Sequence, residues 1–373
     1  MTCCAAAPAE TGSVSSSRRR GREARAAVAS LALLTLLALA PAPAGAAARA
    51  PAGFFGVTPQ AALTAGDLGR MARLGMTLRV PAYWFQLEPE RGTYDFSALD
   101  PTVRAAARAG VRVLPFVYGS PAWAASAPSE PPVAGGRAKA WAAFLRELVA
   151  RYGPRGSFWK GAAARQPIRR WQIWNEPNFR VFWSPRPSPV AYVRLLRRSA
   201  GAIRRQDPGA EIVAAGLAPV EGGLYPWTFL RRMYRHAGAE RSFDVAALHP
   251  YATSLGALEY ELRATRRVMA AAGDGRTRLL VTEVGVASDG RYPNPFDMGR
   301  RGQARFLEDA YRLMLENRRR WRLAGAYWFT WRDGTSPDPN CVFCEYAGLL
   351  DSKGTPKPAW WALKRTVAQA TVR

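Results

Sequence analysis

The chain has 373 residues and a net charge of +25, and 48% of its residues are hydrophobic. This length allows one large domain or two ordinary ones, and the hydrophobic content excludes a chain that is disordered throughout. The positive charge is compatible with an anionic partner, and a composition that is rich in arginine throughout is the alternative explanation. Because the arginines are scattered along the whole chain, we expect no nucleic-acid binding, and association with an anionic cell surface or an acidic polysaccharide stays open.

Residues 1–48 have the pattern of a signal peptide followed by a linker. A basic stretch from Arg18 to Arg25 precedes a run of apolar and small residues over 28–40, and small residues suited to cleavage lie at 44–48. This run is short for a membrane-spanning helix, which needs about 20 residues. We therefore expect a secreted protein with one domain over 49–373. An uncleaved leader that holds the protein at the cell envelope is the alternative.

From residue 54 onward, short apolar strands alternate with amphipathic helical segments. The predicted strands lie at 54–57, 77–84, 111–118, 170–175, 211–216, 244–249, 278–283 and 324–331. The helices that follow them lie near 65–74, 98–109, 137–151, 189–206, 226–236, 257–272, 299–319 and 358–370. This alternation predicts an α/β fold with a closed parallel sheet, the (β/α)₈ or TIM barrel. An open doubly wound sheet would normally have a glycine-rich turn after its first strand, which this chain lacks.

Two glutamates stand where predicted strands end. Glu176 follows the fourth strand in the segment Trp-Asn-Glu-Pro, and Glu283 ends the seventh. Active sites of (β/α)₈ barrels lie at the C-terminal ends of the strands, so both carboxylates are expected at one mouth. A carboxylate next to an apolar strand is costly unless it is paired or used.

The Asn-Glu-Pro after the fourth strand, with a glutamate ending the seventh, resembles the clan A glycoside hydrolases, and families 5 and 39 are the nearest. The resemblance extends from Phe54 to about Ala368. It implies a retaining glycosidase with Glu176 as acid/base and Glu283 as nucleophile. In such enzymes the two carboxyl groups lie about 5–5.5 Å apart and a covalent glycosyl-enzyme forms. The expected partner is a β-linked carbohydrate substrate. We expect the protein to be a monomer and to use neither a cofactor nor a metal.

Further polar side chains are expected around the two glutamates. An arginine inside a barrel strand is an unusual core residue, so Arg79 is predicted to be the cation that keeps Glu283 ionised; an exterior Arg79 bound to a helix is the alternative. The resemblance implies that Asn175 contacts the sugar 2-hydroxyl. It also implies that His249 lines the site and that Tyr251 donates a hydrogen bond to the nucleophile, although a lone histidine is more often an ordinary core residue.

The chain contains 13 tryptophans, whose flat faces can stack on sugar rings. Trp331 is the strongest candidate, because it ends the last predicted strand at a position that resembles a clan A platform. Trp84 and Trp123 follow other strands and are also predicted to bind substrate. For each of them, core packing is the alternative.

Cys341 and Cys344 are predicted to form a disulfide in the loop after the last strand, because two cysteines this close can pair in an oxidising compartment. A structural zinc ion would need two more ligands. Two other classes of function stay open beside the glycosidase: a carbohydrate-binding protein without turnover, and a cell-wall scaffold without sugar affinity. The presence of both carboxylates argues against the binding protein, and only the leader and the charge suggest the scaffold.

Overall fold

The computed structural model describes residues 49–290, 294–335, 341 and 343–371. The predicted signal peptide and linker, 1–48, lie outside these described residues. No helix in the described part of the chain combines the length and the apolar character needed to cross a membrane.

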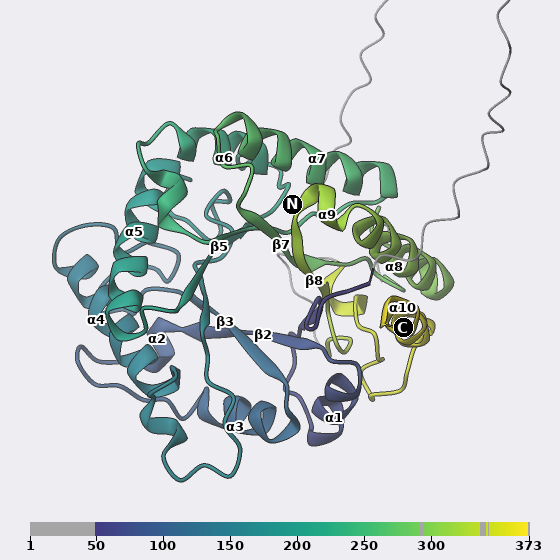
Figure 1. The fold of residues 1–373 in the computed structure, drawn as a ribbon, viewed down its shortest axis with the longest axis horizontal. Helices are drawn as coiled ribbons and strands as arrows, with labels where there is room; N and C mark the ends of the chain where they lie inside the picture. Colours follow the sequence, from purple (N-terminus) through teal and green to yellow (C-terminus); the bar gives the residue numbers. More distant parts are fainter. Residues whose placement is uncertain (1–48, 291–293, 336–340, 342, 372–373) are drawn as a thin grey trace, which may run out of the picture. The chain divides into compact units, whose positions relative to one another are not determined.

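Eight parallel strands close into a barrel in the order in which they occur in the chain (Figure 1). The strands are β1 (Phe55–Thr58), β2 (Thr77–Tyr83), β3 (Arg112–Tyr118), β4 (Arg170–Ile173), β5 (Glu211–Leu217), β6 (Val245–Leu248), β7 (Arg278–Val284) and β8 (Leu323–Phe329). β1 pairs with β8 from Phe55 opposite Ala326 to Thr58 opposite Phe329, so the sheet has no open edge. The predicted (β/α)₈ barrel is confirmed.

Helices surround the barrel, and at least one follows each strand (Figure 1). The longer ones are α1 (Ala65–Arg73), α3 (Asp100–Ala109), α4 (Gly135–Tyr152), α5 (Pro189–Gln206), α6 (Pro226–Tyr234), α7 (Leu255–Ala271), α8 (Gly299–Glu316) and α10 (Pro358–Thr371). The short ones are α2 (Trp84–Leu87), α9 (Arg318–Trp321) and three 3₁₀ turns, η1 (Ser157–Trp159), η2 (Ala239–Ser242) and η3 (Cys344–Tyr346).

Local sequence explains where several helices begin. The Ser188 side chain accepts a hydrogen bond from the backbone of Ala191, and Pro189 occupies the first position of α5. Thr64 and Asp67 form a reciprocal capping box at the start of α1. These caps define where the loops after β1 and β4 end and where α1 and α5 begin.

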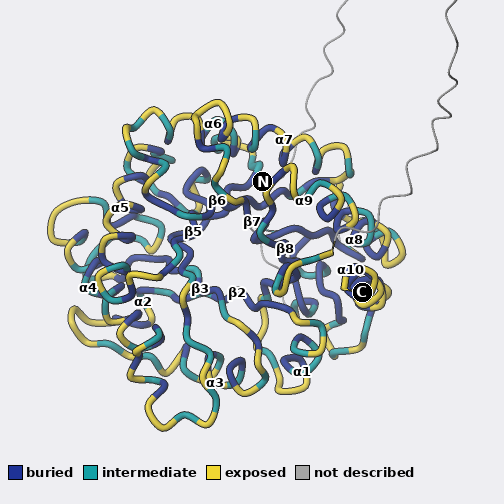
Figure 2. Tube along the Cα trace, in the orientation of Figure 1, coloured by how far each residue is buried: buried dark blue, intermediate teal, exposed yellow. Residues whose placement is uncertain are grey.

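The core has two parts. The larger lies between the strands and the helices, whose outer surfaces are exposed while the strands are buried (Figure 2). A smaller apolar cluster includes residues from β3, β5, β6, β7 and β8. Its buried members are Leu114, Val213, Val245, Ala247, Leu280 and Tyr327. Because successive side chains alternate between the two faces of a strand, each strand can contribute to both parts.

Candidate active site

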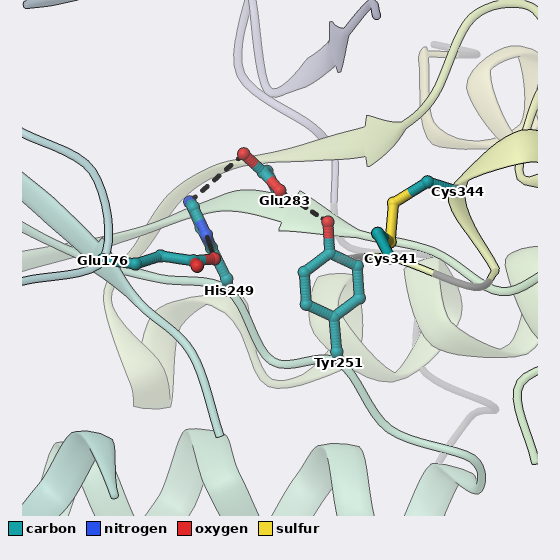
Figure 3. The surroundings of a disulfide bond; sticks show 6 residues. All are labelled: Glu176, His249, Tyr251, Glu283, Cys341 and Cys344. Carbon is teal, nitrogen blue, oxygen red and sulfur yellow. Dashed lines mark hydrogen bonds and ion pairs between the residues drawn. A yellow bond between two sulfur atoms is a disulfide. The ribbon is translucent and has the colours of Figure 1, made fainter. Parts of the chain in front are cut away.

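Glu176 and Glu283 meet at the C-terminal mouth of the barrel (Figure 3). Glu176 lies in the loop after β4, and Glu283 is the penultimate residue of β7. One oxygen of each carboxylate and one ring nitrogen of His249 lie within 4.8 Å of one another. Both glutamates are less than a tenth exposed. The fold therefore brings together the two carboxylates that the strand ends predicted.

The backbone around Glu176 has an uncommon conformation. Trp174 and Glu176 have positive φ angles of 72° and 39°, and among the described non-glycine residues only Arg322 shares this feature. Such conformations cost about 1–3 kcal/mol each and persist where the surroundings hold them. Here the backbone N–H groups of Trp174 and Glu176 donate to the carbonyl oxygens of Val117 on β3 and Gly216 on β5. The neighbouring strands thus hold the loop that presents Glu176.

Arg79 on β2 lies inside the barrel and is fully buried. Its guanidinium donates to Oε1 of Glu283 at 2.5 Å, to Oδ1 of Asn175 at 2.9 Å and to Oε1 of Gln172 at 2.6 Å. It also lies 4.1 Å from the centre of the Phe116 ring. The structure therefore places Arg79 beside Glu283, as predicted, and the exterior alternative is wrong.

Glu283 is surrounded by donors and positive charge. The hydroxyl of Tyr251 donates to its second oxygen, Oε2, at 2.5 Å. Burial acts to raise the pKa of Glu283, but electrostatic interactions with His249 and Arg79 and the hydrogen bonds from Tyr251 and Arg79 outweigh it and hold the pKa below its ordinary value. Burial and the Glu283 charge raise the pKa of Tyr251 well above its usual range, so this hydroxyl remains a donor.

The pKa of Glu176 is shifted in the opposite direction. Burial raises its pKa, the charge of Glu283 adds to this, and a hydrogen bond with His249 opposes it without reversing the shift. Nδ1 of His249 lies 2.7 Å from Oε1 of Glu176, and Nε2 lies 3.7 Å from Oε1 of Glu283 (Figure 3). His249 is fully buried and lies between the two carboxylates, so it contacts the site and is more than an ordinary core residue.

Gly216 makes room for His249. A Cβ atom at Gly216 would lie 2.0 Å from Nε2 of His249, closer than real contacts allow. The imidazole of His249 can therefore occupy its position only because residue 216 is a glycine. Nothing in the local sequence indicated this role of Gly216.

Asn175 is oriented by Arg79. Because the guanidinium donates to its Oδ1, the amide nitrogen Nδ2 points elsewhere, and it makes no hydrogen bond to any residue that the structure describes. This nitrogen remains available as a donor next to Glu176, which fits the contact with a sugar hydroxyl that the resemblance implies.

The tryptophan predictions need correction. Trp84 and Trp331 are both fully buried, so neither has a face open to a sugar. Trp84 belongs to α2 and packs edge-on against Trp123 and Trp141. β8 ends at Phe329, two residues earlier than predicted, and the chain then turns so that Trp331 packs against Trp360.

An aromatic ring at the end of β8 packs against Tyr251, the donor to Glu283. The ring of Phe329, at the end of β8, lies 5.9 Å from that of Tyr251. Trp123 is half-buried, with its indole N–H donating to the carbonyl of Glu88, so it keeps part of its surface exposed. Of the three predicted tryptophans, only Trp123 remains a candidate for substrate contact.

Cys341 and Cys344 are joined by a disulfide, and this loop lies near Tyr251 (Figure 3). Phe343, held between the two cysteines, packs 5.1 Å from the Tyr251 ring and 4.7 Å from Phe296. The disulfide therefore constrains an aromatic wall that supports the donor to Glu283.

Three residues of the site were not predicted from the sequence: Gln172, Phe343 and Gly216. Gln172 accepts a hydrogen bond from Arg79 and donates one to the backbone carbonyl of Ala214. These two bonds hold the guanidinium of Arg79 in place. A signal for it existed, because a glutamine in the apolar segment 170–175 is as unusual as Arg79 in its strand. Phe343 and Gly216 have no comparable signal.

Glu176, His249 and Glu283 offer two oxygens and one nitrogen that could hold a metal ion. However, Arg79 already donates to Oε1 of Glu283, and its fixed positive charge repels a cation. The arrangement therefore suits proton transfer and nucleophilic attack better than metal binding.

No protein-family model and no curated protein sequence matches this chain. Solved structures do. A glucosidase from Croceicoccus marinus is 16% identical, with 87% of this chain and 69% of that chain aligned at a TM-score of 0.62. A GH39 β-xylosidase from Caulobacter crescentus is 19% identical, with 87% and 73% aligned at 0.60. A GH5_18 protein from Streptomyces cattleya, solved in complex with GlcNAc, is 19% identical, with 83% and 75% aligned at 0.62. These similarities show that the chain has the (β/α)₈ fold found in GH39 and GH5_18 glycosidases.

Proposed function

We propose that the protein is a secreted retaining glycoside hydrolase that cleaves β-linked O-glycosidic bonds of an oligosaccharide or polysaccharide. One observation carries this proposal: two buried carboxylates face each other at the barrel mouth with opposite pKa shifts. Their oxygens lie within 4.8 Å, close to the separation of about 5–5.5 Å that retaining enzymes use and well below the 6.5–9.5 Å of inverting enzymes. The fold shared with GH39 and GH5_18 enzymes supports it.

In this proposal Glu176 is the acid/base and Glu283 is the nucleophile. Glu176, kept protonated by burial, donates its proton to the glycosidic oxygen as the bond to the anomeric carbon breaks. Glu283, kept ionised by Arg79 and Tyr251, attacks the anomeric carbon and forms a glycosyl ester. The resulting Glu176 carboxylate then takes a proton from water, whose oxygen displaces Glu283 and releases a sugar of unchanged configuration.

His249 and Asn175 have supporting roles. The contact between His249 and Glu176 holds the acid in one orientation. Asn175 presents its amide N–H to the sugar, and a hydrogen bond that strengthens in the transition state would add several kcal/mol to catalysis. The export pattern over 1–48 and the Cys341–Cys344 disulfide support secretion.

Two variants assayed with added azide test the assignment. Glu283→Gly removes the nucleophile and leaves space on the face opposite the leaving group, so azide should attack directly and yield an inverted glycosyl azide. Glu176→Ala should still react with aryl glycosides whose leaving groups need no proton, and azide should then intercept the glycosyl-enzyme and yield a product of retained configuration. Glu261→Gln is the matched control, because Glu261 is buried in α7 outside the site.

The substrates are aryl β-glucosides, β-xylosides and β-mannosides, with product configuration read by NMR. Substantial activity of Glu283→Gly without azide, or azide products of reversed configuration, would refute the assigned roles. Hydrolysis by the unaltered protein that first releases the α anomer from a β-glycoside would refute the retaining mechanism. If no glycoside in a broad panel of aryl glycosides and polysaccharides turned over, the glycosidase proposal itself would be wrong.

A further inference from the structure

Away from the carboxylates, a hollow of about 560 Å³ lies in the furrow between α6 and α7. These helices are neighbours in the ring around the barrel (Figure 1). The hollow is lined by Trp227, Arg231, Tyr234, Arg235, Tyr260 and Arg267, with alanines of α7 between them. Its lining runs from Trp227 to Arg235 along α6 and from Tyr260 to Ala272 along α7.

Three aromatic rings gather at the end of the hollow formed by the first turn of α6. The rings of Tyr225 and Trp227 are stacked, with centres 5.0 Å apart and planes 5° from parallel. Trp227 also meets the Tyr260 ring edge-on at 5.5 Å. Tyr225 and Tyr260 are each 52% exposed and are among the few large apolar side chains on the described surface. Exposed rings that gather in one patch mark a candidate interaction site.

The rest of the hollow is positively charged. Arg231, Arg235 and Arg267 are exposed, and none of them pairs with a carboxylate in the part of the chain that the structure describes. The neighbouring acid Asp274 is already used, because it accepts hydrogen bonds from Tyr234 and Thr277. Glu259 pairs with Arg263. The furrow thus presents free guanidinium groups beside stacked rings.

We propose that this furrow binds a segment of an acidic polysaccharide, in which sugar rings carry carboxylates. The apolar face of a pyranose ring matches the flat Tyr225 and Tyr260 rings in shape and polarity. Guanidinium groups bind carboxylates through two parallel hydrogen bonds, which suits Arg231 and Arg267. From Trp227 to Arg235 the helix advances by about 12 Å, enough for more than one sugar unit.

Comparison with other basic hollows favours this occupant. A second hollow, of about 400 Å³, is lined by Arg194, Arg198 and Arg205 along α5, and no aromatic ring lines it. A ligand that recognised charge alone would use either place. Of these two hollows, the α6–α7 furrow is the one that combines charge with rings, and this combination fits a charged sugar polymer better than a charged chain without rings.

Binding is measured by titration calorimetry at physiological salt with three polymers. Polygalacturonate has both sugar rings and carboxylates, its fully methyl-esterified form has rings without charge, and polyglutamate has charge without sugar rings. The unaltered protein should bind polygalacturonate most tightly. The double variant Tyr225→Ala/Tyr260→Ala should weaken that binding about tenfold or more and leave the binding of polyglutamate unchanged. The double variant Arg231→Gln/Arg267→Gln should weaken the binding of both polyanions.

Two matched controls separate this furrow from the general basic surface. Arg194→Gln/Arg198→Gln removes the same charge from the hollow without rings, and Trp361→Ala removes a ring that is 49% exposed on α10. Both should leave polygalacturonate binding unchanged. Equal losses in the controls, no effect of the tyrosine changes, or preference for anionic phosphatidylglycerol vesicles over polygalacturonate would overturn the proposal.

Turnover of a small aryl glycoside separates this inference from the proposed function. The furrow variants should hydrolyse it at the rate of the unaltered protein, because the furrow contains none of the catalytic residues. Polygalacturonate binding in a protein that hydrolyses no glycoside would refute the glycosidase and leave the furrow proposal standing.

Discussion

Replacing Tyr251 with phenylalanine removes a single hydroxyl from the site. That hydroxyl donates to Oε2 of Glu283, which has no other donor among the described residues. A hydrogen bond to a charged group contributes about 1.5–3 kcal/mol, and one pKa unit corresponds to about 1.4 kcal/mol. The pKa of Glu283 should therefore rise by about 1–2 units in Tyr251→Phe. The ring itself still packs against Phe343 and Phe329, so the local fold is preserved.

The pH dependence of kcat/KM for an aryl glycoside measures this change. In the proposed mechanism Glu283 must be ionised to attack, so activity is lost as the pH falls through its pKa, and this acid limb should move upward by about 1–2 pH units. The control is Tyr311→Phe, which removes a hydroxyl that bonds to the Ala326 carbonyl in the core. An acid limb that stays in place in Tyr251→Phe would refute the reasoning that this hydroxyl stabilises the ionised nucleophile.

Three other predictions follow from the same structure. If the proposed mechanism holds, kcat/KM of the unaltered protein should be bell-shaped in pH. The acid limb should lie below the ordinary glutamate range because the pKa of Glu283 is lowered, and the alkaline limb should lie above it because the pKa of Glu176 is raised. An acid limb above the ordinary glutamate range, or an alkaline limb below it, would contradict these pKa shifts. Lys357→Met should destabilise the protein by about 3–5 kcal/mol in denaturant unfolding, because it leaves the buried Asp333 carboxylate without its ion pair; a change below about 1 kcal/mol would count against this. Mass spectrometry of exported protein should find Cys341 and Cys344 linked, and thiols that alkylate without reductant would disprove the pairing.

The sequence predicted the parts of the site that follow from strand ends. Glu283 stands near the end of an apolar strand and Glu176 in the loop directly after one. A barrel places all such strand ends at one mouth, so the meeting of the two carboxylates needs no knowledge of side-chain packing. Arg79 was recognisable for a related reason, since a charged residue within a buried strand needs a partner inside the barrel.

The tryptophan platforms could not be predicted in the same way, because they depend on where the chain leaves a strand. Side chains alternate between faces, so the point at which β8 stops decides which aromatic ring faces the mouth. The strand ends at Phe329, and the backbone carbonyl of Trp331 instead accepts hydrogen bonds from Leu349 and Leu350. These contacts come from a segment about 20 residues away, and no local pattern reports them.

Gly216 is the clearest case of a site residue whose role only the structure reveals, and it provides a sharp test. In Gly216→Ala, the new methyl group would lie 2.0 Å from Nε2 of His249, so the imidazole must move and its contact with Glu176 must weaken. That contact lowers the pKa of Glu176, so its loss should shift the alkaline limb of kcat/KM upward, while overpacking costs about 1–3 kcal/mol of stability. Gly201→Ala on α5, where the methyl group meets nothing within 4 Å, is the matched control and should leave the pH profile unchanged. A loss of stability in Gly216→Ala without any shift of the alkaline limb would mean that His249 fills space and does not tune the acid.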